Sequence, residues 1–207
     1  MNEPVVTPAT PHNAWPNSAA LPGFRGLEHV AIVVPDLTEA TSFFRTVLGW
    51  PVAFSAGPFG DPHGGDWMVK NFDLHPRSVV KQLAVVRSPL LNFELFEGSA
   101  PDQATHWPRL LDIGGLHLAL YVDDIDAALD FLVAAGCESL GGIKPLGGPE
   151  TGDGARFGHV RTPFGLYLEL ITYPNGREYE ANASFVAFNP SAPDSLARAF
   201  AASEREL

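Results

Sequence analysis

The pattern of apolar and polar residues changes from a strand period to a helical period soon after residue 34. Residues 27–34 are rich in Val and Ile and end at a proline, which is typical of a β-strand. Apolar residues then recur at helical spacing through residues 37–48, between a good N-cap at Asp36 and a typical C-terminal stop at Gly49. This stretch predicts a strand followed directly by a helix. Successive strand residues point to opposite faces, so one face should seat the helix and the other, which carries His29, should line a cavity.

The same pattern returns 88 positions later (117 − 29), which indicates one supersecondary unit used twice. The offset carries His29 onto His117 and Asp36 onto Asp124. We therefore predict a second strand over residues 115–122, followed by a helix that Asp124 caps and the next glycine ends. The second histidine again shares its strand face with a small residue rather than with the large leucines.

Three shorter apolar stretches follow the helix in each copy, and each of them predicts a strand. In the first copy, residues 57–66 have the composition of a loop, and residues 67–78 carry no firm assignment. Both copies thus predict the order strand, helix, strand, strand, strand, which is an α+β fold of two tandem βαβββ modules. The predicted strands after the helices span residues 50–55, 79–86, 91–96, about 138–143, 156–162 and 166–172.

The regions outside the two modules differ from them in composition. The first 23 residues are rich in Pro, Ala, Asn and Thr without a period, so we expect a flexible extension that carries no chemistry. Residues 194–207 place apolar residues at helical spacings, which predicts a terminal helix that packs on the domain or on a partner subunit. The predicted division is an extension over 1–23, a first module over 24–100, a linker over 101–112, a second module over 113–176 and a C-terminal extension over 177–207.

Charge and composition exclude several classes of partner. The 207 residues carry a formal net charge of −11 and show no cluster of Lys or Arg, so the attraction that drives binding to nucleic acid or anionic membranes is absent. Apolar runs are too short to span a membrane, and the N-terminus lacks the basic start and apolar region of a signal peptide. The single Cys137 cannot form an intramolecular disulfide. We expect a cytoplasmic protein that binds neither nucleic acid nor membrane.

Four residues at equivalent points of the two modules form the candidate site: His29 and His117 on the first strands, Glu94 and Glu169 on the last. Either histidine alone would be read as a structural residue. The glutamates, however, lie within strongly apolar strands, where an unpaired carboxylate costs much free energy to desolvate. A divalent cation would supply the missing counter-charge, and imidazole nitrogen with carboxylate oxygen suits Zn, Ni, Co, Fe or Mn. We therefore predict one divalent metal ion per chain.

Four stretches carry a likeness to a known family: HVAIVVPDL, NFELFEG, GGLHLALYVDDI and TPFGLYLELI. They resemble the signature stretches of the vicinal oxygen chelate superfamily, which includes glyoxalase I, methylmalonyl-CoA epimerase, extradiol dioxygenases and antibiotic-resistance proteins. The likeness covers about residues 27–173. It implies paired βαβββ modules whose curved sheets enclose a metal-binding cavity. It also implies that His29, Glu94, His117 and Glu169 occupy the superfamily's ligand positions.

The superfamily hosts several reactions, and the ligand set favours one class of them. Glyoxalase I is similar in using two histidines and two glutamates, and the superfamily's epimerases use a closely similar set. The resemblance implies a lyase or isomerase that moves a proton through a metal-bound enediolate of a small substrate with vicinal oxygens. Glu169 or Glu94 would act as the base beside the metal.

Two other functions are compatible with the same scaffold. An extradiol dioxygenase would bind iron through His29, His117 and Glu169, and would leave Glu94 without a ligand role. A drug-sequestering resistance protein would need none of these ligands. Superfamily members commonly pair, and the apolar stripe near the C-terminus offers a surface for it, so we also expect a homodimer.

The remaining histidines and two tyrosines receive simpler interpretations. We expect His63, His75 and His106 to lie at the surface, because they fall in the first-module insertion and in the linker. Strand alternation places Tyr121 and Tyr167 on the faces that bear the ligands. There they would line the cavity or form hydrogen bonds to the substrate.

Overall fold

The computed structural model describes residue 22, residue 24, residues 26–183 and residues 186–191. The predicted N-terminal extension, apart from Pro22, and the predicted helix over 194–207 lie outside the described residues. Internal contacts divide the chain into two compact units, Arg25–Gly115 and a unit whose main part begins at Leu116. Within the described part of the chain, no helix is long and apolar enough to cross a membrane.

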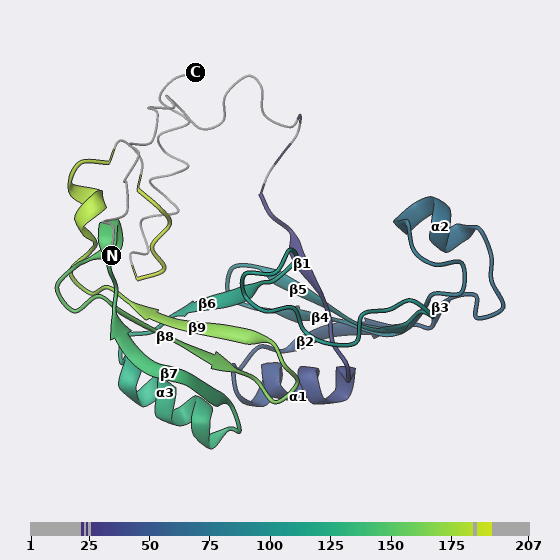
Figure 1. Cartoon of the computed structure of the whole chain (residues 1–207), viewed down its shortest axis with the longest axis horizontal. Helices are drawn as coiled ribbons and strands as arrows, with labels where there is room; N and C mark the ends of the chain where they lie inside the picture. Colours follow the sequence, from purple (N-terminus) through teal and green to yellow (C-terminus); the bar gives the residue numbers. More distant parts are fainter. Residues whose placement is uncertain (1–21, 23, 25, 184–185, 192–207) are drawn as a thin grey trace. The chain divides into compact units, whose positions relative to one another are not determined.

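The first unit is built on a mixed β-sheet (Figure 1). Its strands are β1 (His29–Val33), β2 (Val52–Ala56), β3 (Phe59–Gly60), β4 (Val79–Arg87) and β5 (Asn92–Ser99). Along the sheet the order is β1-β5-β4-β2, and the short β3 also pairs with β4. The pair β1 and β5 is parallel, whereas the other neighbours are antiparallel.

Helix α1 (Leu37–Thr46) covers one face of this sheet and packs on β4 and β5. The side chain of Asp36 accepts a hydrogen bond of 2.8 Å from the backbone N–H of Glu39, which confirms the predicted N-cap. Phe44 on the helix is fully buried, and its ring lies 6.1 Å from that of Phe93 on the sheet. Trp50, just after the helix, stacks on Phe93 with ring centroids 5.3 Å apart. Packed aromatic rings are therefore one part of the core of the first unit, beside its buried aliphatic residues.

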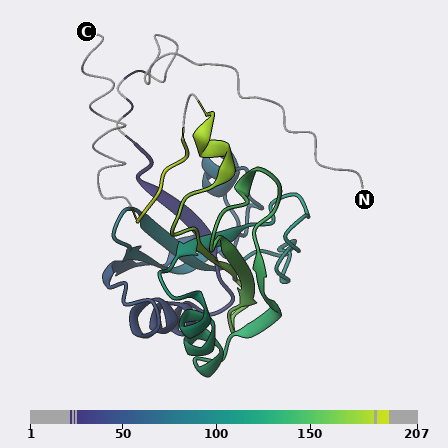
Figure 2. The ribbon, with the colours of Figure 1, turned by 90° about the vertical axis from the view of Figure 1, so that its left-hand side faces the viewer.

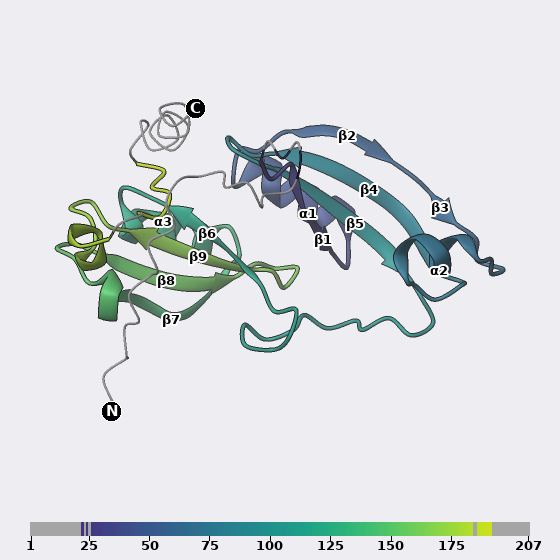
Figure 3. The ribbon, with the colours of Figure 1, turned by 90° about the horizontal axis from the view of Figure 1, so that it is seen from above.

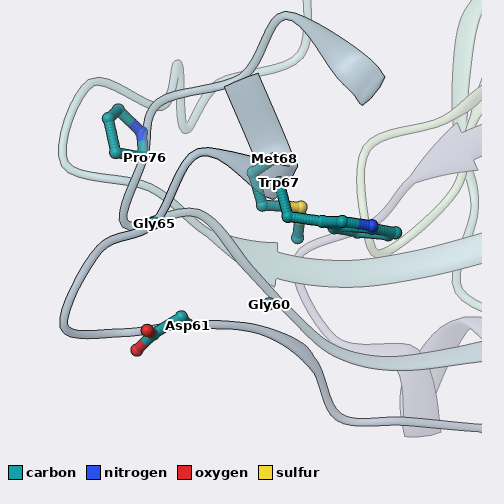
Figure 4. Close-up of a pocket in the computed structure, with 6 residues that line it drawn as sticks. All are labelled: Gly60, Asp61, Gly65, Trp67, Met68 and Pro76. Carbon is teal, nitrogen blue, oxygen red and sulfur yellow. The ribbon is translucent and has the colours of Figure 1, made fainter. Parts of the chain in front are cut away.

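An insertion between β2 and β4 distinguishes the first unit from the second. It contains β3 and a short helix, α2 (Trp67–Phe72), at one end of the sheet (Figure 3). The sequence left this helix unassigned because its apolar residues show no clear period. The insertion also holds a cavity of about 240 Å³, where Trp67 and Met68 lie together and the Asp61 carboxylate points away from them (Figure 4). None of the predicted metal ligands lines this cavity.

The second unit repeats the topology of the first without that insertion. Its strands are β6 (His117–Tyr121), β7 (Glu138–Pro145), β8 (Arg156–Arg161) and β9 (Tyr167–Thr172). They follow the order β6-β9-β8-β7, and β6 is parallel to β9. Helix α3 (Ile125–Ala134) packs along one face of this sheet, against β7, β8 and β9 (Figure 2). Two 3₁₀ turns complete the unit, η1 (Gly148–Glu150) and η2 (Glu178–Ala181).

The caps of α3 also agree with the sequence. The side chain of Asp124 accepts a hydrogen bond of 3.0 Å from the backbone N–H of Ala127. Gly136 follows the helix with a φ of 92°, a left-handed conformation that favours glycine, so the predicted stop is confirmed. The fold is the predicted α+β arrangement of two tandem βαβββ modules, with β3 as an additional short strand.

A buried arginine holds the segment that follows the last strand. Arg177 lies one residue beyond the predicted end of the second module, and only 7% of its side chain is exposed. Its guanidinium lies 4.1 Å from the ring centroid of Tyr173 and forms ion pairs with Glu150 and Glu180. These contacts attach η2 to η1, so the folded part of the second module continues past residue 176.

Candidate metal centre

The parallel pairing of β1 and β5 determines which side chains meet in the first module. His29 pairs with Asn92, and Ala31 pairs with Glu94. Paired residues share a face of a sheet, so His29 and Glu94 project from the same face, opposite to the buried Ile32. The Nε2 atom of His29 lies 3.4 Å from Oε2 of Glu94, and the two side chains are 44% and 23% exposed. This confirms the predicted faces of the strand.

A carboxylate behind His29 orients its ring. Glu28 accepts a hydrogen bond from Nδ1 of His29, and its other oxygen accepts a 2.6 Å hydrogen bond from the Asn92 side-chain amide. The hydrogen bond to Glu28 raises the pKa of His29, and the same bond lowers the pKa of Glu28. With Nδ1 engaged in this way, Nε2 is the nitrogen that faces Glu94. Metal-binding histidines commonly have such a carboxylate partner.

The second module uses the same register at its parallel pair. His117 pairs with Tyr167, and Ala119 pairs with Glu169. Nε2 of His117 lies 3.1 Å from Oε2 of Glu169, and the side chains are 41% and 15% exposed. The structure therefore brings the predicted ligands together as two pairs, one in each module.

A third ligand-type residue joins the pair in the second module. His159 on β8 is directly opposite Glu169 in the antiparallel register. Its ring lies 5.3 Å from that of His117 at an interplanar angle of 78°. Each of the three residues offers one ligand atom, and these atoms all lie within 4.8 Å of one another. Among the described residues this is the only group of three or more His, Cys, Asp or Glu side chains that could hold a metal ion.

Sequence reasoning missed both Glu28 and His159. His159 lies 10 positions before Glu169 (169 − 159), and only the pairing of β8 with β9 makes the two neighbours. Burial lowers the pKa of His159, which favours the uncharged ring that can bind a metal. Strand alternation would have put Glu28 on the helix side, but β1 begins only at His29. Glu28 precedes the strand and is therefore not bound by its alternation.

The other candidate residues take packing or surface positions. Tyr121 makes an edge contact with Tyr173, with ring centroids 4.9 Å apart. Tyr167 lies beside His117 in the parallel pair, on the ligand-bearing face. His63 and His106 are exposed and His75 is half-buried, and none of them belongs to a group that could hold a metal.

Residues 26–170 match the family described as the Glyoxalase/Bleomycin resistance protein/Dioxygenase superfamily. The chain belongs to this superfamily. The match spans most of both modules, and it confirms the likeness that the four sequence stretches carry.

Individual members of the superfamily show further similarities. A 2-epi-5-epi-valiolone epimerase from Actinomyces sp. is 37% identical over 175 residues, which cover 82% of this chain and 91% of the relative. The crystal structure of a glyoxalase family protein from Bacillus cereus superposes with a TM-score of 0.55 at 22% identity, covering 74% of this chain and 98% of that protein. A fosfomycin resistance protein from Listeria monocytogenes, crystallised with Mn(II) and sulfate, gives a TM-score of 0.43 at 18% identity, covering 72% and 93%. The likeness to the Bacillus cereus structure shows the fold alone.

The donor groups of this superfamily member fit a divalent metal ion. Both glutamates are largely withdrawn from solvent, and in the described part of the chain neither forms an ion pair with Lys or Arg. A carboxylate in that position lacks the counter-charge that would offset its desolvation. Each carboxylate faces an imidazole nitrogen, and this combination of donors binds borderline divalent ions such as Zn, Co or Ni. The arrangement can therefore hold a metal and keep a carboxylate beside it.

Proposed function

We propose that this protein is an epimerase that requires a divalent metal ion and acts by proton transfer at a carbon next to a carbonyl group. The observation that carries the proposal is the repeated pair of an imidazole and a half-buried carboxylate, 3.4 Å apart in one module and 3.1 Å in the other. The 37% identity to an epimerase over most of the chain supports the reaction class. Metal and carboxylate together are what proton abstraction from a weakly acidic carbon requires.

The proposed metal ligands are His29, Glu94, His117 and Glu169. A divalent ion bound there would stabilise the negative charge that develops on the substrate oxygen when the neighbouring carbon loses its proton. The chain's own residues hold the substrate carbon and move the proton. The exposed sides of His29 and His117 leave room for a small molecule to approach the donors.

We assign proton removal to Glu94. Glu169 lies against two imidazoles, His117 and His159, and is the more buried carboxylate, which suits a residue committed to holding metal. Among the described residues Glu94 faces one imidazole, that of His29, and it is the more exposed carboxylate, so it is the one that a substrate can approach more readily. Return of a proton to the opposite face of the flattened carbon, from water or a second acid, completes the inversion.

The test is an NMR assay of metal-loaded protein in D₂O, with 2-epi-5-epi-valiolone as the first substrate, since the relative carries that name. We expect conversion to an epimer that carries deuterium at the inverted carbon. Chelator-treated protein is the matched control and should be inactive until a divalent ion is restored. Fully metal-loaded protein that exchanges no substrate hydrogen, across this and related hydroxyketones, would contradict the proposal.

One observation favours a second candidate function. Two histidines and one glutamate on adjacent strands are the donor set that non-haem Fe(II) oxygenases use, and the second module supplies it as His117, His159 and Glu169. A ring-cleaving dioxygenase is therefore the alternative, although the sequence alone had suggested His29 in place of His159. Oxygen uptake with a catechol on the iron-loaded protein would select it over the epimerase.

A further inference from the structure

We propose that His159 is a metal ligand, so that the second module supplies three donors and holds a divalent ion even when the donors of the first module are removed. The inference rests on the proposed metal dependence, and it adds a residue that the duplicated sequence pattern does not identify. It also makes the two modules unequal, because the second would supply three metal donors and the first only two.

The backbone holds the three donors on one face of three adjacent strands. β6, β9 and β8 are neighbours in the sheet, and Glu169 on the middle strand has Ala119 on one side and His159 on the other. A sheet of hydrogen-bonded strands is a rigid support, which suits a metal site. His117 projects from the position next but one to Ala119, so both imidazoles flank the same carboxylate.

The distances among the donors suit a single ion. Metal bonds to His nitrogen and carboxylate oxygen are about 2.0–2.2 Å long, so donors around one ion lie roughly 3–4 Å apart. The ligand atoms of His117, His159 and Glu169 already lie within 4.8 Å of one another. This separation is only slightly larger than the one that donors around a single ion require.

Packing alone does not account for this group. An edge contact between two imidazole rings, such as that of His117 with His159, stabilises a fold only slightly. It gives no reason for a largely buried carboxylate to lie against both rings. Phe157 contacts His159 edge-on at 5.8 Å and restricts its ring on the other side. In the first module, the residue opposite Glu94 is Val85, so the sheet itself does not require a histidine at this place.

The experiment is a Co²⁺ titration of the chelator-treated full chain, followed by visible absorption, which reports the number and kind of donors, and by equilibrium dialysis. We compare wild type with His159→Gln, which removes the imidazole, and with His159→Val, a β-branched residue suited to the strand and found at the equivalent place in the first module. His63→Gln is the matched control, because His63 is exposed and belongs to no group that could hold a metal. Far-UV circular dichroism establishes that each variant is folded.

We expect one Co²⁺ per wild-type chain, and a Kd raised about 100-fold or more in both His159 variants, since loss of even an outer-shell partner costs about 10- to 100-fold. His63→Gln should bind as wild type does, and a double variant His29→Gln, Glu94→Gln should still bind one Co²⁺. Folded His159 variants with wild-type affinity and spectrum would overturn the inference. Proton NMR of the Co²⁺ protein gives a second readout: wild type should show a shifted ring N–H signal that is absent from the His159 variants.

These readouts are separate from turnover. If the protein binds Co²⁺ through His159 but inverts no substrate, the proposed epimerase activity fails and this inference stands. If turnover requires metal while His159 contributes nothing to affinity or spectrum, the inference fails and the proposed activity stands.

Discussion

The two modules have the same strand order and the same register at their parallel pairs, yet they surround their ligands differently. In the first module, Glu28 supports His29 from behind, and Val85 lies opposite Glu94. In the second module, Leu116 occupies the place of Glu28 at the offset of 88 (116 − 28). His159 there takes the place of Val85. A duplicated backbone thus provides duplicated ligand positions, and the neighbouring side chains decide how strongly each pair can bind a metal.

The cores of the modules differ as well. The residue after the helix-ending glycine is Trp50 in the first module, where it stacks on Phe93, and the buried Cys137 in the second. Leu168 and Leu132 take part in the core of the second module, and both are buried. Both cores combine aliphatic and aromatic residues, the first with Phe44 and Phe93 and the second with Tyr173, and the two can be perturbed separately.

The largest effect on stability is expected for Phe44→Ala. Phe44 is fully buried among aromatic rings, and removing such a side chain costs about 3–5 kcal/mol of unfolding free energy. Urea unfolding followed by tryptophan fluorescence reports mainly the unit Arg25–Gly115, because three of the four tryptophans, Trp50, Trp67 and Trp107, lie in it. Leu132→Ala in the second module should shift that transition much less. Equal shifts for both variants would show that the two cores unfold as one.

The next largest effect concerns metal affinity. Replacing His117 by Ala removes one of three donors in the second module, and we expect the Kd for Co²⁺ to rise about 100-fold or more. Replacing His29 by Ala leaves those three donors intact, so a rise of only about tenfold is expected. Equilibrium dialysis measures both values. Equal losses of Co²⁺ affinity in the His29 and His117 variants would contradict the proposed difference between the two modules.

A gain of metal binding is expected from Val85→His. Val85 is opposite Glu94 in the strand register, just as His159 is opposite Glu169 in the second module. The change therefore places a histidine beside the carboxylate of the first module. We expect Co²⁺ to bind about tenfold more tightly to the first module, as measured in a background that carries His117→Ala. Val85→Gln is the control, since it adds a polar side chain of similar length without an imidazole. Equal Co²⁺ affinities of the two variants would mean that a side chain at position 85 does not reach the metal donors of the first module.

The smaller of the two effects on stability is a pH dependence in the second module. Burial raises the pKa of Cys137 to about 11 from its ordinary value near 9. The unfolded chain therefore loses this thiol proton first as the pH rises, and the folded state is destabilised progressively between pH 9 and pH 11. One pKa unit corresponds to about 1.4 kcal/mol, so the loss is at most about 3 kcal/mol. The urea midpoints of wild type and Cys137→Ala should diverge between pH 9 and pH 11. Midpoints that change with pH in the same way in both proteins would contradict this prediction.

Most of the fold could be predicted from the sequence because its signals are local. The caps at Asp36 and Asp124, the change of period after each first strand and the offset of 88 between copies identify both modules. Helix α2 could not be predicted, because it is only 6 residues long and carries no apolar period. Met68 is the one buried residue of α2, so contacts with the rest of the folded unit, rather than a sequence pattern, determine where this helix forms.

The candidate site could be predicted only where duplication made it visible. The two histidines and two glutamates stand out because each has a counterpart in the other copy. Glu28 and His159 have none, since their counterparts are Leu116 and Val85. Their roles depend on where β1 begins and on the pairing of β8 with β9, which are long-range features of the folded chain. Residues that make the modules unequal are thus the ones that a search for repeats overlooks.

We propose that the second module supplies most of the metal affinity and that Glu94 in the first removes the proton. The most direct test is Glu94→Gln, which keeps an oxygen donor of nearly the same shape but removes the basic group, with Glu169→Gln as the matched variant. Co²⁺ content and epimerisation rate are measured on the same samples. We expect Glu94→Gln to retain Co²⁺ and to lose turnover by about 100- to 10,000-fold, and Glu169→Gln to lose Co²⁺. Near-normal turnover of Glu94→Gln with Co²⁺ bound would contradict this proposal.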